Sequence, residues 1–221
     1  MADLTWKTGD VPVSVRFDDP YFSLENGLAE TRHVFLAGND LPARFQPGFH
    51  IAELGFGTGL NFLTALLAWQ EAGAPGPLFF TSFEAYPMSR DEMTRALAAF
   101  PELAQVSGCL TAQWQTSGCR AEVPPGVHLE VIIGDARATL PAWTGRADAW
   151  FLDGFSPARN PELWSADLMG EVAAHTDQGG TFATYTAAGF VRRALAEGGF
   201  DVTRSPGFGR KRHMSWGVLR P

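Results

Sequence analysis

A glycine-rich turn in the first third of the chain has the residue types and the spacing of a small-ligand site. Gly55, Gly57 and Gly59 alternate with other residues directly after the apolar run 50–54, and a helical pattern follows them. Such a strand–turn–helix unit directs backbone N–H groups at a ligand on the helix N-terminus. The spacing is one residue shorter than the Gly-x-Gly-x-x-Gly pattern of dinucleotide sites. The turn therefore predicts a ligand site but does not by itself identify the ligand.

Three acidic residues stand at the ends of three successive apolar runs. Glu53 closes the run before the glycines, Glu84 ends the next run, and Asp135 ends the third. A carboxylate beside the glycine turn repels a pyrophosphate but attracts a ligand that carries an ammonium and a sulfonium. We therefore expect S-adenosyl-L-methionine, with Glu84 accepting both ribose hydroxyls and Asp135 near the adenine. Taken singly, each acid could also cap a helix or face solvent.

A fourth acid, Asp153, follows the apolar run 147–152 and precedes a loop rich in glycine and proline. Methyl transfer to an amine requires the neutral amine, yet an alkyl amine with a pKa of about 10 is mostly protonated near pH 7. We expect Asp153 to orient the amine and to help its proton leave. Phe155 and Trp164 could stack on a flat substrate such as a base, or they could belong to the core.

The sequence pattern predicts that a parallel sheet positions these residues. Short apolar runs that are typical of buried strands occupy residues 50–54, 78–83, 128–133, 147–152 and 181–185. Helical patterns separate several of them, which predicts a doubly wound, mostly parallel α/β fold. Residues 200–204 and 212–219 flank a short glycine-containing loop and predict an antiparallel hairpin at the sheet edge.

The length of 221 residues fits one large domain with a small addition. We assign residues 46–221 to the main domain and residues 1–45 to an N-terminal extension or lid packed on it. The chain shows no export signal and no apolar run long enough to cross a membrane, so we expect a cytoplasmic protein without a membrane partner. Its five histidines show no metal-ligand spacing, and we expect no metal.

The net charge of −7 disfavours nucleic acid as a partner, but the charge is unevenly distributed. Residues 186–221 contain seven Lys+Arg and two Asp+Glu, whereas residues 1–185 contain 10 and 22. The basic end could offer phosphates a positive face, or its charges could be scattered over the surface. The candidates for phosphate contacts are Arg192, Arg193, Arg210, Lys211 and Arg212.

Several further stretches give the chain a specific resemblance. Together with the residues above, they resemble the methyltransferase domain of the MnmC family, which completes 5-methylaminomethyl-2-thiouridine at the wobble position of tRNA. The matching stretches are residues 17–23, 27–36, 53–63, 83–87, 151–161 with Trp164, 184–193 and 207–212. The resemblance therefore extends over most of the chain from residue 17 onward, and it is far more specific than the glycine turn alone.

The resemblance implies a Rossmann-like, class I S-adenosylmethionine-dependent methyltransferase that acts on the tRNA anticodon stem-loop. It implies that the three glycines and Glu53, Glu84 and Asp135 hold the cofactor, and that Asp153 faces an aminomethyl group. It also implies that Tyr21, Phe22, Glu30 and Arg32 help build the pocket. We assign Tyr21, Asn61 and Ala136 to the cofactor site as well.

Bifunctional members of the family carry a further flavin-dependent oxidase domain, which this chain does not contain. We therefore expect no flavin, and we expect a separate protein to supply the aminomethyl intermediate. Other functions stay open. They are a methyltransferase for a small-molecule or protein amine, a non-catalytic protein that keeps S-adenosylmethionine for structure, and a dinucleotide oxidoreductase.

Overall fold

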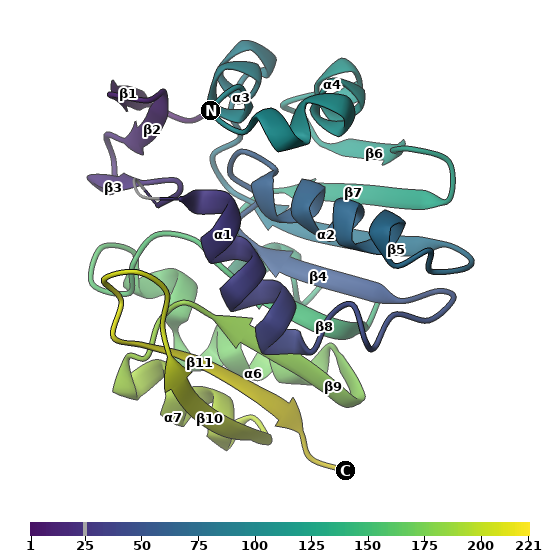
Figure 1. The fold of residues 1–221 in the computed structure, drawn as a ribbon. Helices are drawn as coiled ribbons and strands as arrows, with labels where there is room; N and C mark the ends of the chain where they lie inside the picture. Colours follow the sequence, from purple (N-terminus) through teal and green to yellow (C-terminus); the bar gives the residue numbers. More distant parts are fainter. Residues whose placement is uncertain (24–25) are drawn as a thin grey trace.

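The computed structural model describes residues 1–23 and 26–221, and its centre is an eight-stranded sheet. The strand order is β10-β11-β9-β8-β4-β5-β7-β6, and the five strands from β9 to β7 are parallel to one another (Figure 1). These parallel strands are β4 (His50–Leu54), β5 (Leu78–Glu84), β7 (Val127–Ile133), β8 (Ala147–Leu152) and β9 (Thr176–Thr184). The five predicted strands are all present, and β9 begins five residues before its apolar run.

Helices cover both faces of this sheet, so the predicted doubly wound architecture is confirmed. One face carries α1 (Gly27–Thr31), α2 (Leu60–Glu71), α3 (Arg90–Leu97) and α4 (Ala104–Gln113). The other face carries α5 (Ala136–Thr139), α6 (Ala166–Ala174) and α7 (Gly189–Glu197). Each face has its own buried apolar cluster, which is the expected consequence of parallel strands joined by helical crossovers.

The two edges of the sheet are antiparallel. At one edge β11 (His213–Leu219) pairs with β9, and β10 (Phe200–Pro206) pairs with β11. This is the predicted C-terminal hairpin, with its second strand inserted next to the parallel sheet. At the other edge β6 (Cys119–Glu122) pairs with β7. Its four residues include an arginine and a glutamate, so no apolar run marks it in the sequence.

The N-terminal segment forms two different structures. Strands β1 (Leu4–Lys7), β2 (Val11–Ser14) and β3 (Asp19–Pro20) make a small antiparallel sheet of their own. After it, α1 continues through a π-helical turn, η1 (Arg32–Leu36), and a 3₁₀ turn, η2 (Ala37–Asn39), that pack beside α2 and over β9. Their apolar side chains belong to the same buried cluster as α2. This helical segment is thus a layer of the main fold, and the boundary at residue 45 stays a prediction.

The remaining helical turns are η3 (Pro101–Leu103) and η4 (Pro161–Trp164). Helix α3 begins at Arg90 after a capping box in which Ser89 and Glu92 make both reciprocal hydrogen bonds. Among the residues that the structure describes, no helix is long and apolar enough to cross a bilayer.

The strand order of the sheet marks the place where ligands bind in this kind of fold. From β4 the chain crosses to β5 on one side, and β8 lies on the other side of β4. In open α/β sheets this reversal of strand order leaves a crevice outside the carboxyl ends of the strands.

Candidate active site

A cavity of about 560 Å³ opens at this carboxyl edge. The loops after β4, β5, β7 and β8 line it, together with residues of the N-terminal segment and of the β10–β11 loop. Its volume lies within the range of about 300–1,000 Å³ that is usual for sites of small ligands. The predicted site residues that line it are Tyr21, Phe22, Glu30, Gly55, Gly57, Asn61, Glu84, Asp135, Ala136, Asp153, Phe155, Arg210 and Lys211.

Two of the three glycines of the glycine turn line the cavity. Gly55 and Gly57 line the cavity with φ values of 84° and 54°, in the left-handed region that favours glycine. A Cβ on Gly57 would lie 3.2 Å from the ring of Tyr21. Gly59 does not line the cavity, and its assignment to the cofactor stays a prediction. It starts α2 at a φ of 79°, where a Cβ would lie 2.7 Å from Leu110 Cδ2.

We expect Gly59→Ala to lower the stability of the protein by about 1–3 kcal/mol, because it adds both a strained φ and a steric clash. Thermal unfolding should show a Tm lower by roughly 3–10 °C. Gly108→Ala in α4 is the matched control, since a Cβ there meets open space. An unchanged Tm in Gly59→Ala would contradict a structural role for this glycine.

Glu84 holds the glycine turn in place from the end of β5. Its Oε2 accepts a hydrogen bond from Gly57 N at 2.8 Å, and its Oε1 accepts one from Tyr86 N at 2.7 Å. Burial raises the pKa of this carboxyl, and the backbone donors oppose that effect. Each carboxylate oxygen keeps a second acceptor position, so Glu84 can still receive ribose hydroxyls.

Asp135 lies at the cavity, as predicted, and it also caps a helix, which is the alternative interpretation. It is the N-cap of α5 and accepts from Arg137 N, while its Oδ2 lies 2.6 Å from the Arg137 guanidinium. This pairing lowers the pKa of Asp135. Asp135 and the following Ala136 both line the cavity, so they border it while they start the helix.

Glu53 does not line the cavity, so the structure does not bring it to the predicted position, and a contact of its carboxylate with the ligand stays a prediction. Side chains alternate along β4: Ile51 belongs to the cluster under α2, and Ala52 and Leu54 belong to the opposite one. Glu53 therefore points toward α2, where it is fully buried and accepts from Asn61 Nδ2 at 2.9 Å and Ser82 Oγ at 2.6 Å. Burial raises its pKa well above the usual range.

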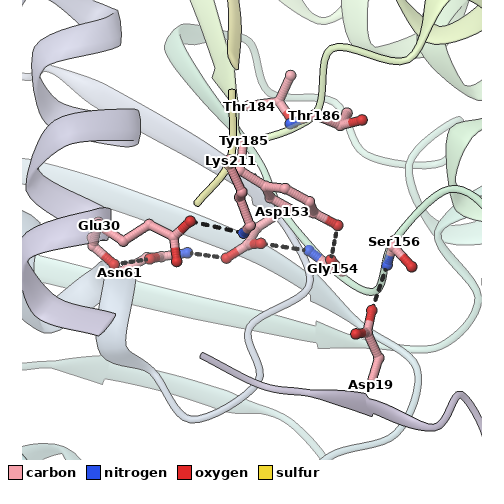
Figure 2. A network of polar contacts seen from close by, with 11 residues as sticks. Asp19, Glu30, Asn61, Asp153, Gly154, Ser156, Thr184, Tyr185, Thr186 and Lys211 are labelled. Carbon is pink, nitrogen blue, oxygen red and sulfur yellow. Dashed lines mark hydrogen bonds and ion pairs between the residues drawn. The ribbon is translucent and has the colours of Figure 1, made fainter. Parts of the chain in front are cut away.

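Asn61 connects Glu53 to Asp153. Asn61 Nδ2 donates to Asp153 Oδ2 at 2.7 Å (Figure 2), and the same Nδ2 donates to Glu53. Asn61 Oδ1 accepts from Thr31 Oγ1 at 2.9 Å. The other oxygen of Asp153, Oδ1, accepts from Gly154 N at 2.8 Å. Burial raises the pKa of Asp153 from 3.8 to about 6, although both hydrogen bonds and the charge of Lys211 oppose this. Asp153 is thus a fixed carboxyl group that ionises close to neutral pH.

The loop after β8 is held by the N-terminal segment. Phe155 lines the cavity and stacks on Phe17 at a centroid distance of 4.6 Å. Asp19 Oδ2 accepts from Ser156 N at 2.8 Å, and Asp18 pairs with Arg159 at 2.7 Å. The segment before α1 thereby fixes the loop that carries Asp153.

Two predicted substrate residues do not line the cavity. Trp164 is fully buried in the cluster beneath the loop, where its Nε1 donates to Phe155 O at 2.9 Å. The structure therefore shows the core placement of Trp164, and stacking on a substrate stays a prediction. Arg32 is exposed and does not line the cavity. It follows Glu30 by two helical positions, about 200° around the axis, and Glu30 lines the cavity. A contact of Arg32 with the substrate stays a prediction.

The predicted basic residues divide into two groups. Arg210 and Lys211, in the β10–β11 loop, line the cavity, whereas Arg192, Arg193 and Arg212 lie outside it. Contact of these residues with phosphates stays a prediction. Two residues that sequence reasoning did not select also line the cavity, namely Thr31 and Tyr185. Ser82 lies outside it and bonds the buried Glu53. Both Thr31 and Tyr185 lie in stretches that carry the resemblance, 27–36 and 184–193, whereas no pattern marks Ser82.

Comparison with known proteins identifies the class. Residues 101–220 match the family described as S-adenosyl-L-methionine-dependent methyltransferase, and because this is more than half of the chain, the chain belongs to that family. It is 48% identical over 99% of its length to the tRNA 5-methylaminomethyl-2-thiouridine biosynthesis bifunctional protein MnmC of Hahella chejuensis. It is 46% identical over 98% of its length to the MnmC of Methylobacillus flagellatus. The chain spans 37% and 35% of these two relatives, and the predicted resemblance to the MnmC family is confirmed.

Solved structures agree on the fold. MnmC2 from Aquifex aeolicus superposes with a TM-score of 0.76 at 23% identity, covering 100% of this chain and 72% of that chain. TrmN from Thermus thermophilus gives a TM-score of 0.50 at 19% identity, covering 83% of this chain and 47% of that chain. The predicted Rossmann-like class I methyltransferase fold, with its antiparallel edge hairpin, is confirmed.

Proposed function

We propose that the protein methylates the exocyclic amine of 5-aminomethyl-(2-thio)uridine at the wobble position of tRNA, giving 5-methylaminomethyl-2-thiouridine. The names of the longer relatives support this substrate, since both are tRNA 5-methylaminomethyl-2-thiouridine biosynthesis proteins. The observation that carries the proposal is the placement of Asp153. Its carboxyl lines the same cavity as the glycine turn and ionises close to neutral pH.

The residues at the glycine end of the cavity fit S-adenosylmethionine. Gly55 and Gly57 expose backbone where side chains would collide with Tyr21 or with the backbone of Gly154. Glu84 offers acceptors for ribose hydroxyls, and Asp135 and Ala136 border the same space. When bound, S-adenosylmethionine supplies an electrophilic methyl group.

In this proposal Asp153 is the group that accepts the proton of the substrate amine. A substrate alkylammonium with a pKa of about 10 has no free lone pair at neutral pH. The Asp153 carboxylate orients the ammonium and accepts its proton on a carboxylate oxygen, which leaves the nitrogen lone pair free for the methyl group. Its raised pKa makes this carboxylate a stronger base than an exposed aspartate.

The pH dependence follows from the direction of this shift. Asp153 is active when ionised, so kcat/KM should rise tenfold per pH unit below about pH 6 and level off above it. A pH profile of initial rates at low substrate concentration measures this rise of kcat/KM with pH. The Asp153→Asn variant should not show the rise. If the rise persists unchanged in that variant, the ionisation belongs to another group.

The proposed partner is the anticodon stem-loop of cytoplasmic tRNA, with a separate protein supplying the aminomethyl group. Purified chain with methyl-labelled S-adenosylmethionine should label tRNA that carries 5-aminomethyl-2-thiouridine and should leave tRNA with unmodified uridine unlabelled. Nucleoside mass analysis should then show one added methyl group on the aminomethyl nucleoside. Normal cofactor binding without methylation of this tRNA would refute the proposal.

A methyltransferase for a small-molecule or protein amine is the second candidate, because the carboxyl-lined cavity alone does not require RNA. Salt discriminates between the two. If Arg193, Arg210 and Arg212 each contact a phosphate, tRNA affinity should fall roughly 20- to 40-fold between 50 and 200 mM salt. Filter binding at constant pH measures this slope, and a flat response would favour the small amine.

A further inference from the structure

The cavity already contains a primary alkylammonium group that belongs to the protein. Lys211 Nζ, from the β10–β11 loop, lies 2.7 Å from Glu30 Oε1 on α1. The same nitrogen lies 4.0 Å from the centre of the Tyr185 ring, which follows β9. Figure 2 shows the ends of the Glu30, Lys211 and Asp153 side chains gathered together. These four residues, Glu30, Asp153, Tyr185 and Lys211, all line the same cavity.

The groups around this ammonium are fixed, whereas Lys211 itself is accessible. The Glu30 side chain is 11% exposed and the Lys211 side chain is 45% exposed. The Tyr185 hydroxyl donates to Gly154 O at 2.8 Å, so the ring is tied to the loop of Asp153. Glu30 precedes Thr31, which bonds the Asn61 that holds Asp153. The cage and the catalytic carboxyl therefore share one framework.

The charges also act on one another. The positive charge of Lys211 lowers the pKa of Asp153, and the negative charge of Glu30 raises it. An ammonium at this place thus stabilises the ionised form of Asp153 that the proposed reaction needs. A carboxylate together with the face of an aromatic ring is a recognition site for organic cations.

We propose that Glu30 and Tyr185, beside Asp153, form a cage for the primary alkylammonium group of the substrate, and that Lys211 occupies this cage until the substrate displaces it. The lysine ε-ammonium and a protonated aminomethyl group have the same chemistry, so one can replace the other without leaving Glu30 unpaired. The inference rests on the proposed function only for the molecule that carries the amine.

The sequence makes displacement directly observable, because the chain contains two lysines, Lys7 and Lys211. In protein labelled with ¹³C at lysine Cε, the Lys211 signal should be shifted by the ring current of Tyr185, whereas that of exposed Lys7 should not. Lys211→Arg assigns the two signals. Benzylammonium at millimolar concentration should move the Lys211 signal toward the position of Lys7, and Glu30→Gln should weaken this response at least threefold.

An anticodon stem-loop carrying 5-aminomethyluridine should move the signal in the same way, and one with unmodified uridine should not. Equal shifts with both RNAs would overturn the proposal, because Lys211 would then be a phosphate contact. The proposal would also be overturned if benzylammonium or the aminomethyl-bearing RNA binds and the ¹³C signal of Lys211 does not change position. Displacement by benzylammonium without methylation of any tRNA would retain the cage and refute only the proposed substrate.

Kinetics give a second readout. Lys211→Met removes the internal competitor, so at pH 8, where Asp153 is ionised, KM for a primary-amine substrate should fall about three- to tenfold with kcat within about twofold. Lys7→Met on β1 is the control and should change neither constant. A KM that rises in Lys211→Met with a small amine would show that Lys211 assists binding, and would contradict displacement.

Discussion

Replacing Asp153 with asparagine is expected to lower kcat by about 100-fold or more while the dissociation constant of S-adenosylmethionine changes less than about threefold. An amide cannot accept the proton of the substrate ammonium, and loss of a positioned general base has effects of this size. The cofactor should still bind, because the glycine turn is held by Glu84 and not by Asp153. The loss should therefore be confined to steps after cofactor binding.

Steady-state rates with saturating substrates, together with calorimetric titration of the cofactor, measure the two quantities separately. In Asp153→Asn the new amide N–H₂ group can face the N–H₂ group of Asn61, which now donates to Asp153. Asp153→Ala avoids this clash of two donors and should show the same loss of kcat. Asp167→Asn, on the exposed start of α6, is the matched control. Unchanged turnover in both Asp153 variants would remove this residue from the mechanism.

The parts of the site that could be predicted are those carried by a strand and the turn after it. A run of apolar residues buried on both faces marks a parallel strand, and the residue after it must lie at the ligand edge. That reasoning located Glu84, Asp135 and Asp153 correctly at the cavity. It failed for Glu53 because this residue lies inside its strand, where alternation and not the sheet edge decides the direction of the side chain.

The parts that could not be predicted depend on contacts between distant segments. Lys211 meets Glu30 across 181 positions of the chain, and no local pattern links an exposed loop with the first helix. Thr31 bonds Asn61 only because α1 packs beside α2. Trp164 is equally ambiguous in sequence, since an aromatic residue after a loop can face the ligand or support the loop from beneath, and here it supports the loop.

The shared direction of Glu53 and Asp153 has a single physical cause. On β8, Ala149 and Phe151 face the cluster under α2, and Asp153 continues the same alternation one position beyond the strand. Glu53 pairs in register with Phe151 and points the same way. One amide on the first turn of α2, that of Asn61, can therefore bond both carboxyl groups. The buried acid thus serves to orient Asn61, which in turn fixes Asp153.

Replacing Glu84 with alanine is expected to weaken S-adenosylmethionine binding by about 30- to 100-fold. Each of its oxygens accepts a hydrogen bond from a backbone N–H group, at Gly57 and at Tyr86. Hydrogen bonds to a charged group contribute about 1.5–3 kcal/mol each, and part of this free energy holds the turn in its binding conformation. A loss of about 2.0–2.7 kcal/mol corresponds to the stated change in affinity.

Isothermal titration of the variant with S-adenosylmethionine measures this change, and circular dichroism establishes that the fold is retained. Glu84→Gln keeps one acceptor oxygen but turns an amide N–H₂ toward a backbone donor, so its affinity should lie between those of the wild type and Glu84→Ala. Glu102→Ala, at an exposed position of η3, should bind the cofactor as the wild type does. Because Asp153 is untouched, kcat at saturating cofactor should fall much less in Glu84→Ala than in Asp153→Asn. Wild-type affinity in a folded Glu84→Ala protein would show that the glycine turn keeps its shape without this carboxylate, and that Glu84 does not bind the ribose.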